Sequence, residues 1–284
     1  MGNGALAGAV LDERVDRSSG APAHGHHSWT EATVPAAAPI RRPRLQQLCT
    51  IAGFDVCLLT RTRHDGVADP LAAEALALER ATMRRLGDEA EVIAFDIAET
   101  IGSSTFVLLI GCPPDRPHRP ELIGAVRLML GDVDGIKTLW DVDRLSPRLR
   151  GPRHPWMGDP TQLVDALALS PAPDTGLGAA EISDLLMAAC TCVGGALLHS
   201  GRARYLTGYV HERFHRHVTR IGYPMHRFVP DDHASNYEFA PVVASLEAID
   251  HLVRVSPTGT HFGDLRGEYL RVVGAAASLG TADW

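Results

Sequence analysis

The sequence has almost no lysine: Lys137 is the single one, and arginine supplies the other 26 of its 27 basic residues. Lys137 ends a turn-like stretch, Gly131–Lys137, so we exclude enzyme classes that need a reactive lysine, pyridoxal-phosphate enzymes among them. An excess of basic residues is also missing, because 27 Lys and Arg stand against 34 Asp and Glu. The resulting net charge of −7 argues against a protein that binds nucleic acid through a basic face.

Long hydrophobic runs are absent as well. The longest, Phe106–Cys112, is far shorter than the roughly 20 residues that span a bilayer, and the N-terminus shows no secretory signal pattern. Cysteine is scarce, with five residues and no CxxC pair, which predicts buried or free thiols in a reducing compartment. We therefore expect a cytoplasmic protein without a membrane partner.

The sequence does contain enough apolar material for a folded domain, with 45% hydrophobic and 21% charged residues. Residues 1–44 are rich in Gly, Ala, Pro, Ser and His and show no apolar periodicity, which predicts a disordered tail. The tail histidines His24, His26 and His27 fit a solvated segment better than a metal site. Residues 45–284 are expected to form one domain.

The predicted elements alternate between helices and strands. Helices are expected over Asp69–Leu86, Ala179–Ser200, His211–Ile221 and Asp264–Ala277, with a short one around Lys137–Asp143. Strands are expected over Asp55–Leu59, Glu91–Asp96, Thr105–Cys112, Glu121–Leu130, Thr161–Leu169, Ala203–Val210 and near Val242–Leu246. The Thr105 and Glu121 strands should form a hairpin. This order predicts an α/β domain built on one layered sheet.

Three charged residues near the first strands are candidates for a site. Asp96 and Glu99 are three apart at the end of a predicted strand, a place where carboxylates suit a cationic or amine substrate. Arg127 lies inside an otherwise apolar strand, where a guanidinium is costly unless it is paired or solvated. The simpler interpretation is a surface turn and an arginine on an edge strand.

Two further polar stretches lie in the second half. Gln162 and Asp165 stand inside a predicted strand, where their odd spacing places them on opposite faces. The loop with Gly176, Leu177 and Gly178 precedes a helix that opens at Ala179, and exposed amides at a helix start favour a phosphate. The alternative is an ordinary loop whose helix carries an acidic first turn.

The string His211–His215 spells HExxH, which on a helix is the pattern of zinc hydrolases. Arg213 occupies an interior position that such helices keep uncharged, and a third ligand such as Glu238 has no supporting motif. The alternative is a polar helix face with Phe214 turned inward.

Together these stretches resemble the GNAT acyltransferase superfamily and, within it, the acyl-homoserine-lactone (autoinducer) synthases. Asp96-Ile97-Ala98-Glu99 is similar to the family's acidic D-x-x-D, and Gly124-Ala125-Val126-Arg127-Leu128 matches its G-x-x-R-L strand. His211–Phe228, with Gly222-Tyr223, is similar to the family's second half. The resemblance runs from about Leu76 to Leu252 and implies a single mixed, mostly antiparallel sheet with helices on both faces.

The resemblance also implies a reaction. An acyl group passes from a thioester, acyl-CoA or an acyl carrier protein, to the amine of S-adenosylmethionine, and a lactone closes with loss of methylthioadenosine. Asp96 and Glu99 would hold the cationic substrate, and Arg127 would anchor a carboxylate or position the acidic pair. Asp165 would orient the amine or act as its base.

The same resemblance implies the remaining contacts and no tightly bound cofactor or metal. Substrate contacts are expected at Arg80 and Gln162, and contacts to the phosphopantetheine arm at Gly176, Leu177 and Gly178. The sequence departs from the family in two places. The Glu and Arg spaced three apart in its fourth strand are missing, and Pro173 stands where GNAT enzymes have Arg or Gln.

Three functions therefore stay open. The first is a synthase that uses S-adenosylmethionine, with acyl transfer or by direct cyclisation or cleavage. The second is a GNAT N-acyltransferase acting on another amine, and the third is a non-catalytic GNAT-like binding protein.

Overall fold

The computed structural model describes residues 44–60, 70–86, 88, 90–114, 116–139, 159–173, 175–227 and 239–276, all within the unit formed by Ile40–Trp284. Residues 1–43 of the predicted N-terminal tail, the histidines among them, lie outside the described residues, whereas Arg44 is the first residue of a strand. Glu238 and residues 140–143 of the short predicted helix lie outside them as well.

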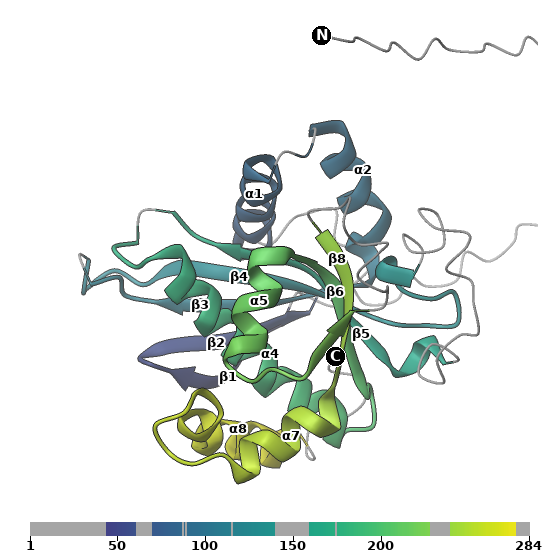
Figure 1. The fold of residues 1–284 in the computed structure, drawn as a ribbon. Coiled ribbons are helices and arrows are strands. Elements are labelled where there is room, and N and C mark those ends of the chain that lie inside the picture. Colours follow the sequence, from purple (N-terminus) through teal and green to yellow (C-terminus); the bar gives the residue numbers. More distant parts are fainter. Residues whose placement is uncertain are drawn as a thin grey trace, which may run out of the picture. The chain divides into compact units, whose positions relative to one another are not determined.

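The unit is built on an eight-stranded sheet with the order β1-β2-β3-β4-β5-β6-β8-β7 (Figure 1). The strands are β1 (Arg44–Ile51), β2 (Phe54–Thr60), β3 (Ser104–Gly111), β4 (Glu121–Leu130), β5 (Leu163–Pro171), β6 (Tyr205–His211), β7 (Met225–Arg227) and β8 (Phe239–Ser245). Neighbouring strands are antiparallel except β5 and β6, which pair in parallel. The predicted mixed, mostly antiparallel sheet is confirmed, and so is the β3–β4 hairpin.

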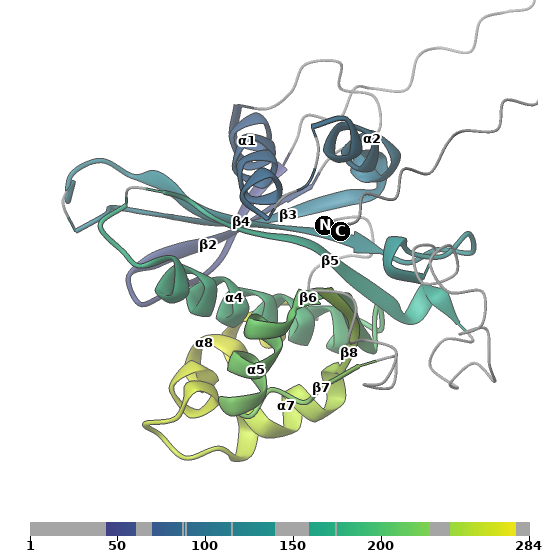
Figure 2. The ribbon, with the colours of Figure 1, turned by 45° about the horizontal axis from the view of Figure 1, so that its top comes forward.

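Helices cover both faces of this sheet. They are α1 (Pro70–Arg85), α2 (Ala90–Thr100), α4 (Ala179–His199), α5 (Glu212–Arg220), α7 (Leu246–Val255) and α8 (His261–Ala276), with 3₁₀ turns η1 (Ile101–Ser103) and η4 (Pro160–Gln162). Figure 2 shows α1 and α2 on one face and α4, α5, α7 and α8 on the other. The predicted placement of helices on both faces is therefore also confirmed.

The strand predicted over Glu91–Asp96 is wrong, because these residues belong to α2. Ile93 and Ile97, four residues apart, are both buried in the cluster between α1 and the sheet. A short apolar run does not distinguish a strand from a buried helix by its periodicity. Asp96 and Glu99 consequently lie on a helix and not at a strand end.

Three other expectations about elements need correction. The strand predicted to start at Thr161 begins at Leu163, because Asp159 caps η4 by accepting the amide of Thr161. The last predicted strand ends at Ser245, where an unpredicted helix, α7, begins with the Ser245 hydroxyl as its cap. β1 and β7 were not predicted either.

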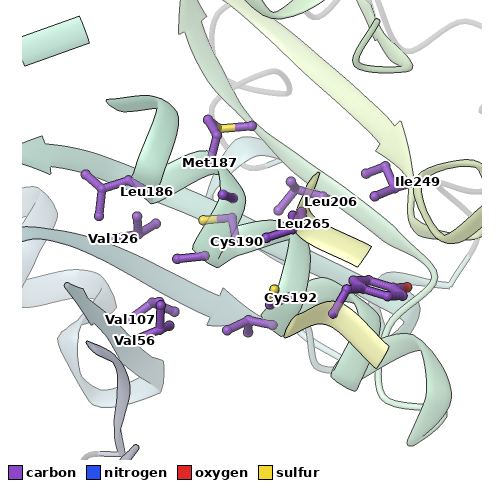
Figure 3. Close-up of a cluster of buried hydrophobic side chains, with 14 of the residues drawn as sticks. Val56, Val107, Val126, Leu186, Met187, Cys190, Cys192, Leu206, Ile249 and Leu265 are labelled. Atoms are coloured by element: carbon purple, nitrogen blue, oxygen red, sulfur yellow. The ribbon is translucent and has the colours of Figure 1, made fainter. Parts of the chain in front are cut away.

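The larger core lies on the face covered by α4. Figure 3 shows Val56, Val107 and Val126 of three neighbouring strands packed against Leu186 and Cys190 of α4. The five cysteines are free, as predicted, and four are buried. Burial raises the pKa of the Cys190 thiol to about 12, so this thiol stays protonated at neutral pH.

α4 is long and apolar enough, by length and composition alone, to cross a membrane. In the folded unit 72% of its most apolar window is buried. A helix of this composition is also what the centre of a folded core requires.

Candidate active site

The strands β5 and β6 separate halfway along the sheet. They pair from Leu163 with Tyr205 to Ala166 with Gly208, and their parallel register ends there. The rest of β5 stays paired with β4 up to Pro171, and the rest of β6 stays paired with β8 up to His211. Beyond Ala166 and Gly208 the two strands are not paired with each other, and we call this divergence of their backbones the opening.

A β-bulge marks the place where this opening starts. Arg127 of β4 pairs with Ala168 and Leu128 pairs with Ala166, so Leu167 is the extra residue of β5. A bulge leaves its extra residue outside the regular ladder of hydrogen bonds. The bulge lies directly beside the last β5–β6 pair, Ala166 with Gly208.

The loop from β5 to α4 contains the three predicted phosphopantetheine contacts. Gly176 has a φ of 74°, a left-handed conformation that glycine adopts without strain. Gly178 is the N-cap of α4, and no side chain caps the helix. The first amides of α4 therefore face outward as donors, although Glu181 already places a carboxylate in this first turn.

On the opposite face, Arg127 is the centre of a buried polar network. Its guanidinium donates to both carboxylate oxygens of Glu79 on α1, at 2.6 to 3.0 Å, and also to the hydroxyls of Thr100 and Ser104. The side chains of Arg127 and Glu79 are only 1% and 3% exposed. The interpretation of Arg127 as an edge arginine is wrong, because β4 is an interior strand.

Asp96 joins this network at its more accessible end. Its carboxylate lies 3.7 Å from Nη2 of Arg127 and 2.6 Å from Nζ of Lys137. The side chains of Asp96 and Lys137 are 27% and 13% exposed, so solvent reaches the pair. The only lysine of the chain is therefore part of the charged group around a predicted site residue.

Asp165 is fully buried on β5 and accepts three hydrogen bonds. The amide and the hydroxyl of Thr138 donate to it at 2.7 and 2.6 Å, and the hydroxyl of Thr207 on β6 donates at 3.1 Å. Asp165 pairs with Met129 of β4, and Met129 is two residues beyond Arg127. The side chains of Asp165 and Arg127 therefore lie on the same face of the sheet. Lys137 contacts Asp96 and the next residue, Thr138, contacts Asp165. The segment Lys137–Thr138 therefore connects the two carboxylates.

The structure thus brings together Asp96, Arg127 and Asp165, but not the other predicted substrate contacts. Arg80 is exposed on α1, and Gln162 is half-buried in η4, where its carbonyl accepts the amide of Arg204. The side chain of Glu99 lies outside the described residues. Sequence reasoning missed Glu79 and did not assign Lys137 to the site.

The HExxH string does not have the expected arrangement. His211 is the last residue of β6 and caps α5 by accepting the amide of Arg213, so it precedes the helix. The carboxylate of Glu212 is bound by Arg227 and lies 3.5 Å from Arg216. Within the described ranges, no three His, Cys, Asp or Glu side chains are grouped as metal ligands.

α5 instead presents a shallow, open depression among the side chains of Arg213, Arg216, His217 and Arg220, which we call the basic hollow. His217 is 2.7 Å from a carboxylate oxygen of Asp184 on α4. The exposed arginine side chains make this hollow locally cationic in a chain of negative net charge.

No family model and no curated protein matches the chain. Among solved structures, the AHL synthase LasI is similar, with 14% identity, a TM-score of 0.46, and coverage of 68% of this chain and 90% of LasI. FeeM, an N-acyl amino acid synthase from uncultured soil microbes, has 12% identity, a TM-score of 0.41, and coverage of 72% and 91%.

Tetrahymena GCN5 has 11% identity, a TM-score of 0.37, and coverage of 68% and 95%. These similarities concern the fold.

Proposed function

We propose that this protein is an N-acyltransferase that transfers an acyl group from a thioester to the amine of S-adenosylmethionine. The observation that carries the proposal is the opening between β5 and β6, which starts at a bulge and ends at the uncapped start of α4. One face of this region carries the charged group around Asp96 and Arg127.

The donor's phosphopantetheine arm suits the opening. The arm carries two amide groups, and a strand edge without a neighbouring strand offers the hydrogen bonds that such groups need. Its phosphate would meet the amides at the start of α4, beside Gly176 and Gly178. The main chain at the Leu167 bulge is our candidate for stabilising the oxyanion that forms when the amine attacks the thioester carbonyl.

An acyl carrier protein fits the surroundings better than free coenzyme A. Pro173 supplies no positive charge to the loop, and Glu181 opposes the several phosphates of coenzyme A. The basic hollow on α5 offers the cationic groups that an acidic carrier surface would pair with. Acyl-CoA remains the alternative donor, and the experiment below includes both.

The acceptor would bind at the Asp96 end of the polar network. Asp96 would hold the ammonium or sulfonium of S-adenosylmethionine, and Arg127 would keep Asp96 in place with its charge balanced by Glu79. The three hydrogen bonds to Asp165 favour a role in positioning the Lys137–Thr138 segment over a role as base.

In the transfer step, the bound ammonium group first loses one proton to water. The amine nitrogen then bonds to the thioester carbonyl carbon, the carbon–sulfur bond of the thioester breaks, and the leaving thiolate takes the second proton from the nitrogen. Lactone closure follows when the carboxylate oxygen of the acceptor attacks the carbon beside the sulfonium. The bond between this carbon and the sulfonium sulfur then breaks, and methylthioadenosine is released. No oxidant or reductant is needed in either step.

The test is incubation of the purified full chain with S-adenosylmethionine, first alone and then with acyl carrier or acyl-CoA donors, followed by mass spectrometry. We expect an acylated product and methylthioadenosine only when a donor is present, and both should be lost in Asp96→Asn. Exposed Asp88→Asn is the matched control.

Methylthioadenosine without a donor would instead indicate direct cyclisation or cleavage. An acylated product from another amine alone would favour the second function, an N-acyltransferase with a different acceptor. If no product formed with any donor or amine, the non-catalytic binding function would be favoured.

A further inference from the structure

Cys49 of β1 and Cys192 of α4 are two free thiols that meet in the interior of the protein. Their side chains are 1% and 0% exposed, belong to the same hydrophobic core and share a hydrogen bond. β1 packs on α4, and Figure 3 shows Cys192 in the cluster that contains Val56, the residue of β2 that pairs with Cys49. The two cysteines come from distant parts of the chain, so tertiary packing makes their contact.

The fold selects this pair among the buried cysteines. A disulfide requires two cysteines whose side chains point toward each other. Cys57 of β2 belongs to the core cluster between α1 and the sheet, on the face opposite to Cys49. Cys190 is two residues before Cys192 on α4, and side chains at this spacing do not face each other on a helix. The hydrogen-bonded thiols of Cys49 and Cys192 are therefore oriented as a disulfide requires.

The hydrogen bond makes the two sulfur atoms chemically unequal. The thiol of Cys192 donates to the sulfur of Cys49, and this bond lowers the pKa of Cys49 against the opposing effect of burial. The same bond, together with burial, raises the pKa of Cys192. The thiolate is the form of cysteine that attacks an oxidant. Cys49 is therefore the sulfur that reacts first.

The position of Cys49 in the sheet provides a route for a small oxidant. β1 is an edge strand, so its main chain is hydrogen-bonded to only one neighbouring strand, β2. Parts of a fold with fewer contacts open locally at a lower cost in free energy than the core does. Brief opening of β1 exposes Cys49, whereas Cys192 stays covered at the centre of the larger core.

We propose that Cys49 and Cys192 form a redox modification site, in which hydrogen peroxide converts the two thiols into a disulfide that ties β1 to α4. The Cys49 sulfur attacks one peroxide oxygen, the oxygen–oxygen bond breaks, and Cys49 becomes a sulfenic acid while water is released. The Cys192 sulfur then attacks the Cys49 sulfur, the sulfur–oxygen bond breaks, and a second water leaves as the disulfide forms. In total the two thiols give two electrons and two protons to the peroxide. This inference is independent of the proposed acyl transfer.

The test is to treat the reduced full chain with hydrogen peroxide and to measure its intact mass. We expect the mass to fall by that of two hydrogen atoms, and to recover when dithiothreitol reduces the disulfide. The background is Cys112→Ser, because Cys112 is the one cysteine that is not buried and reacts on its own.

Peptide mapping with a double variant assigns the bond. Trypsin leaves Cys49 and Cys57 together in one peptide, and Cys190 and Cys192 together in another. In Cys57→Ala/Cys190→Ala each of these peptides keeps one cysteine, so a cross-link between them identifies the bond from Cys49 to Cys192. This assignment needs no variant of the two reacting cysteines.

The disulfide should also stabilise the fold. A bond between distant parts of the chain restricts the unfolded state, and we expect the thermal midpoint of the oxidised protein to be roughly 5–10 °C above that of the reduced protein. The rise should be absent in Cys49→Ala and retained in Cys57→Ala, the matched control on the opposite face of the sheet.

Four results would overturn the inference: an unchanged mass, a gain of oxygen atoms without a cross-link, a loss of two hydrogen atoms that persists in Cys49→Ala, or a cross-link that forms only in urea-unfolded protein. A cross-link in folded protein without a rise of the thermal midpoint would reject the tie between β1 and α4.

Discussion

Arg127 of β4 and Glu79 of α1, 48 residues apart in the chain, meet through three hydrogen bonds in the interior of the protein. Each side chain alone would be an uncompensated buried charge. The pair fixes α1 on the sheet and holds Arg127 beside Asp96.

Removing one partner of this pair should be strongly destabilising. We expect Glu79→Leu to lower the free energy of unfolding by about 3–5 kcal/mol, because it removes the carboxylate that is hydrogen-bonded to the buried Arg127 guanidinium and leaves only Asp96, 3.7 Å away. Removing both charges in Glu79→Leu/Arg127→Met should recover much of this loss.

Urea denaturation of the two variants measures both effects. The exposed ion pair of Arg204 and Glu247 supplies the control, since Glu247→Leu should cost less than about 1 kcal/mol. Equal losses in the buried and the exposed variant would contradict the prediction.

Asp250 of α7 should give the protein a pH-dependent stability below neutrality. Burial acts to raise its pKa, but hydrogen bonds from Arg254, His199 and Tyr269 prevail and lower it from 3.8 to about 2. A carboxyl whose folded pKa is depressed stabilises the fold above its unfolded pKa, and this stability is lost as the pH falls from about 4 towards 2.

We expect wild-type protein to exceed Asp250→Asn in unfolding free energy by on the order of 1 kcal/mol at pH 6, with the difference shrinking towards pH 2, after allowance for partial solvent exposure. Denaturant titrations between pH 2 and pH 6 measure it. A constant difference between wild type and Asp250→Asn from pH 2 to pH 6 would refute the assignment.

Substitution of two helical glycines by alanine should change the stability of the protein in opposite directions. A Cβ on Gly195 of α4 would lie 2.4 Å from the Tyr269 ring on α8, whereas one on Gly274 of α8 would meet nothing within 4 Å. Gly195→Ala should therefore cost about 1–3 kcal/mol through overpacking. Gly274→Ala should add about 0.5–1 kcal/mol through helix propensity.

The thermal unfolding midpoints of the two variants report this contrast. A second change, Tyr269→Leu, should relieve part of the loss in Gly195→Ala if the clash is its cause. Equal thermal midpoints for Gly195→Ala and wild type would contradict the prediction, because they would mean that α4 and α8 accommodate the extra methyl group without a loss of stability.

The basic hollow on α5 should matter for a carrier-bound donor only. Arg216→Glu/Arg220→Glu reverses two of its charges, and we expect the KM for an acyl carrier thioester to rise by about tenfold or more. The KM for an acyl-pantetheine thioester, which lacks the carrier, should stay within about twofold, since it makes no such contact.

Steady-state kinetics with both donors separates the two effects, and Arg119→Glu on another exposed surface is the control. An equal rise in KM with both donors would show that the hollow affects folding or catalysis and not recognition of the carrier.

The sequence pattern predicted an α/β domain built on one sheet, because β3, β4 and α4 carry long, uniform patterns. The mostly antiparallel order and the helices on both faces were expected from the family resemblance. The pattern failed at α2, where Val92, Ile93, Phe95 and Ile97 mix exposed and buried apolar residues. It also failed at β7, whose three residues are too few to show a period.

The candidate site was predictable only where a residue stood out from its surroundings. Arg127 did, as a charge in an apolar strand. Glu79 did not, since a glutamate among the charged residues of α1 looks like any surface residue until the helix is docked. Lys137 and Asp96 are 41 positions apart, and no local pattern announces a contact made by tertiary packing.

The parallel β5–β6 contact has a mechanical consequence. It is a short seam of four residue pairs that joins two antiparallel groups of strands, β1–β5 and β6–β8. We expect the sheet to flex along this seam. Because α4 packs on β3, β4 and β5 of the first group, such flexing would move β6–β8 relative to α4 and widen the free end of the opening, while its apex at Ala166 and Gly208 stays closed.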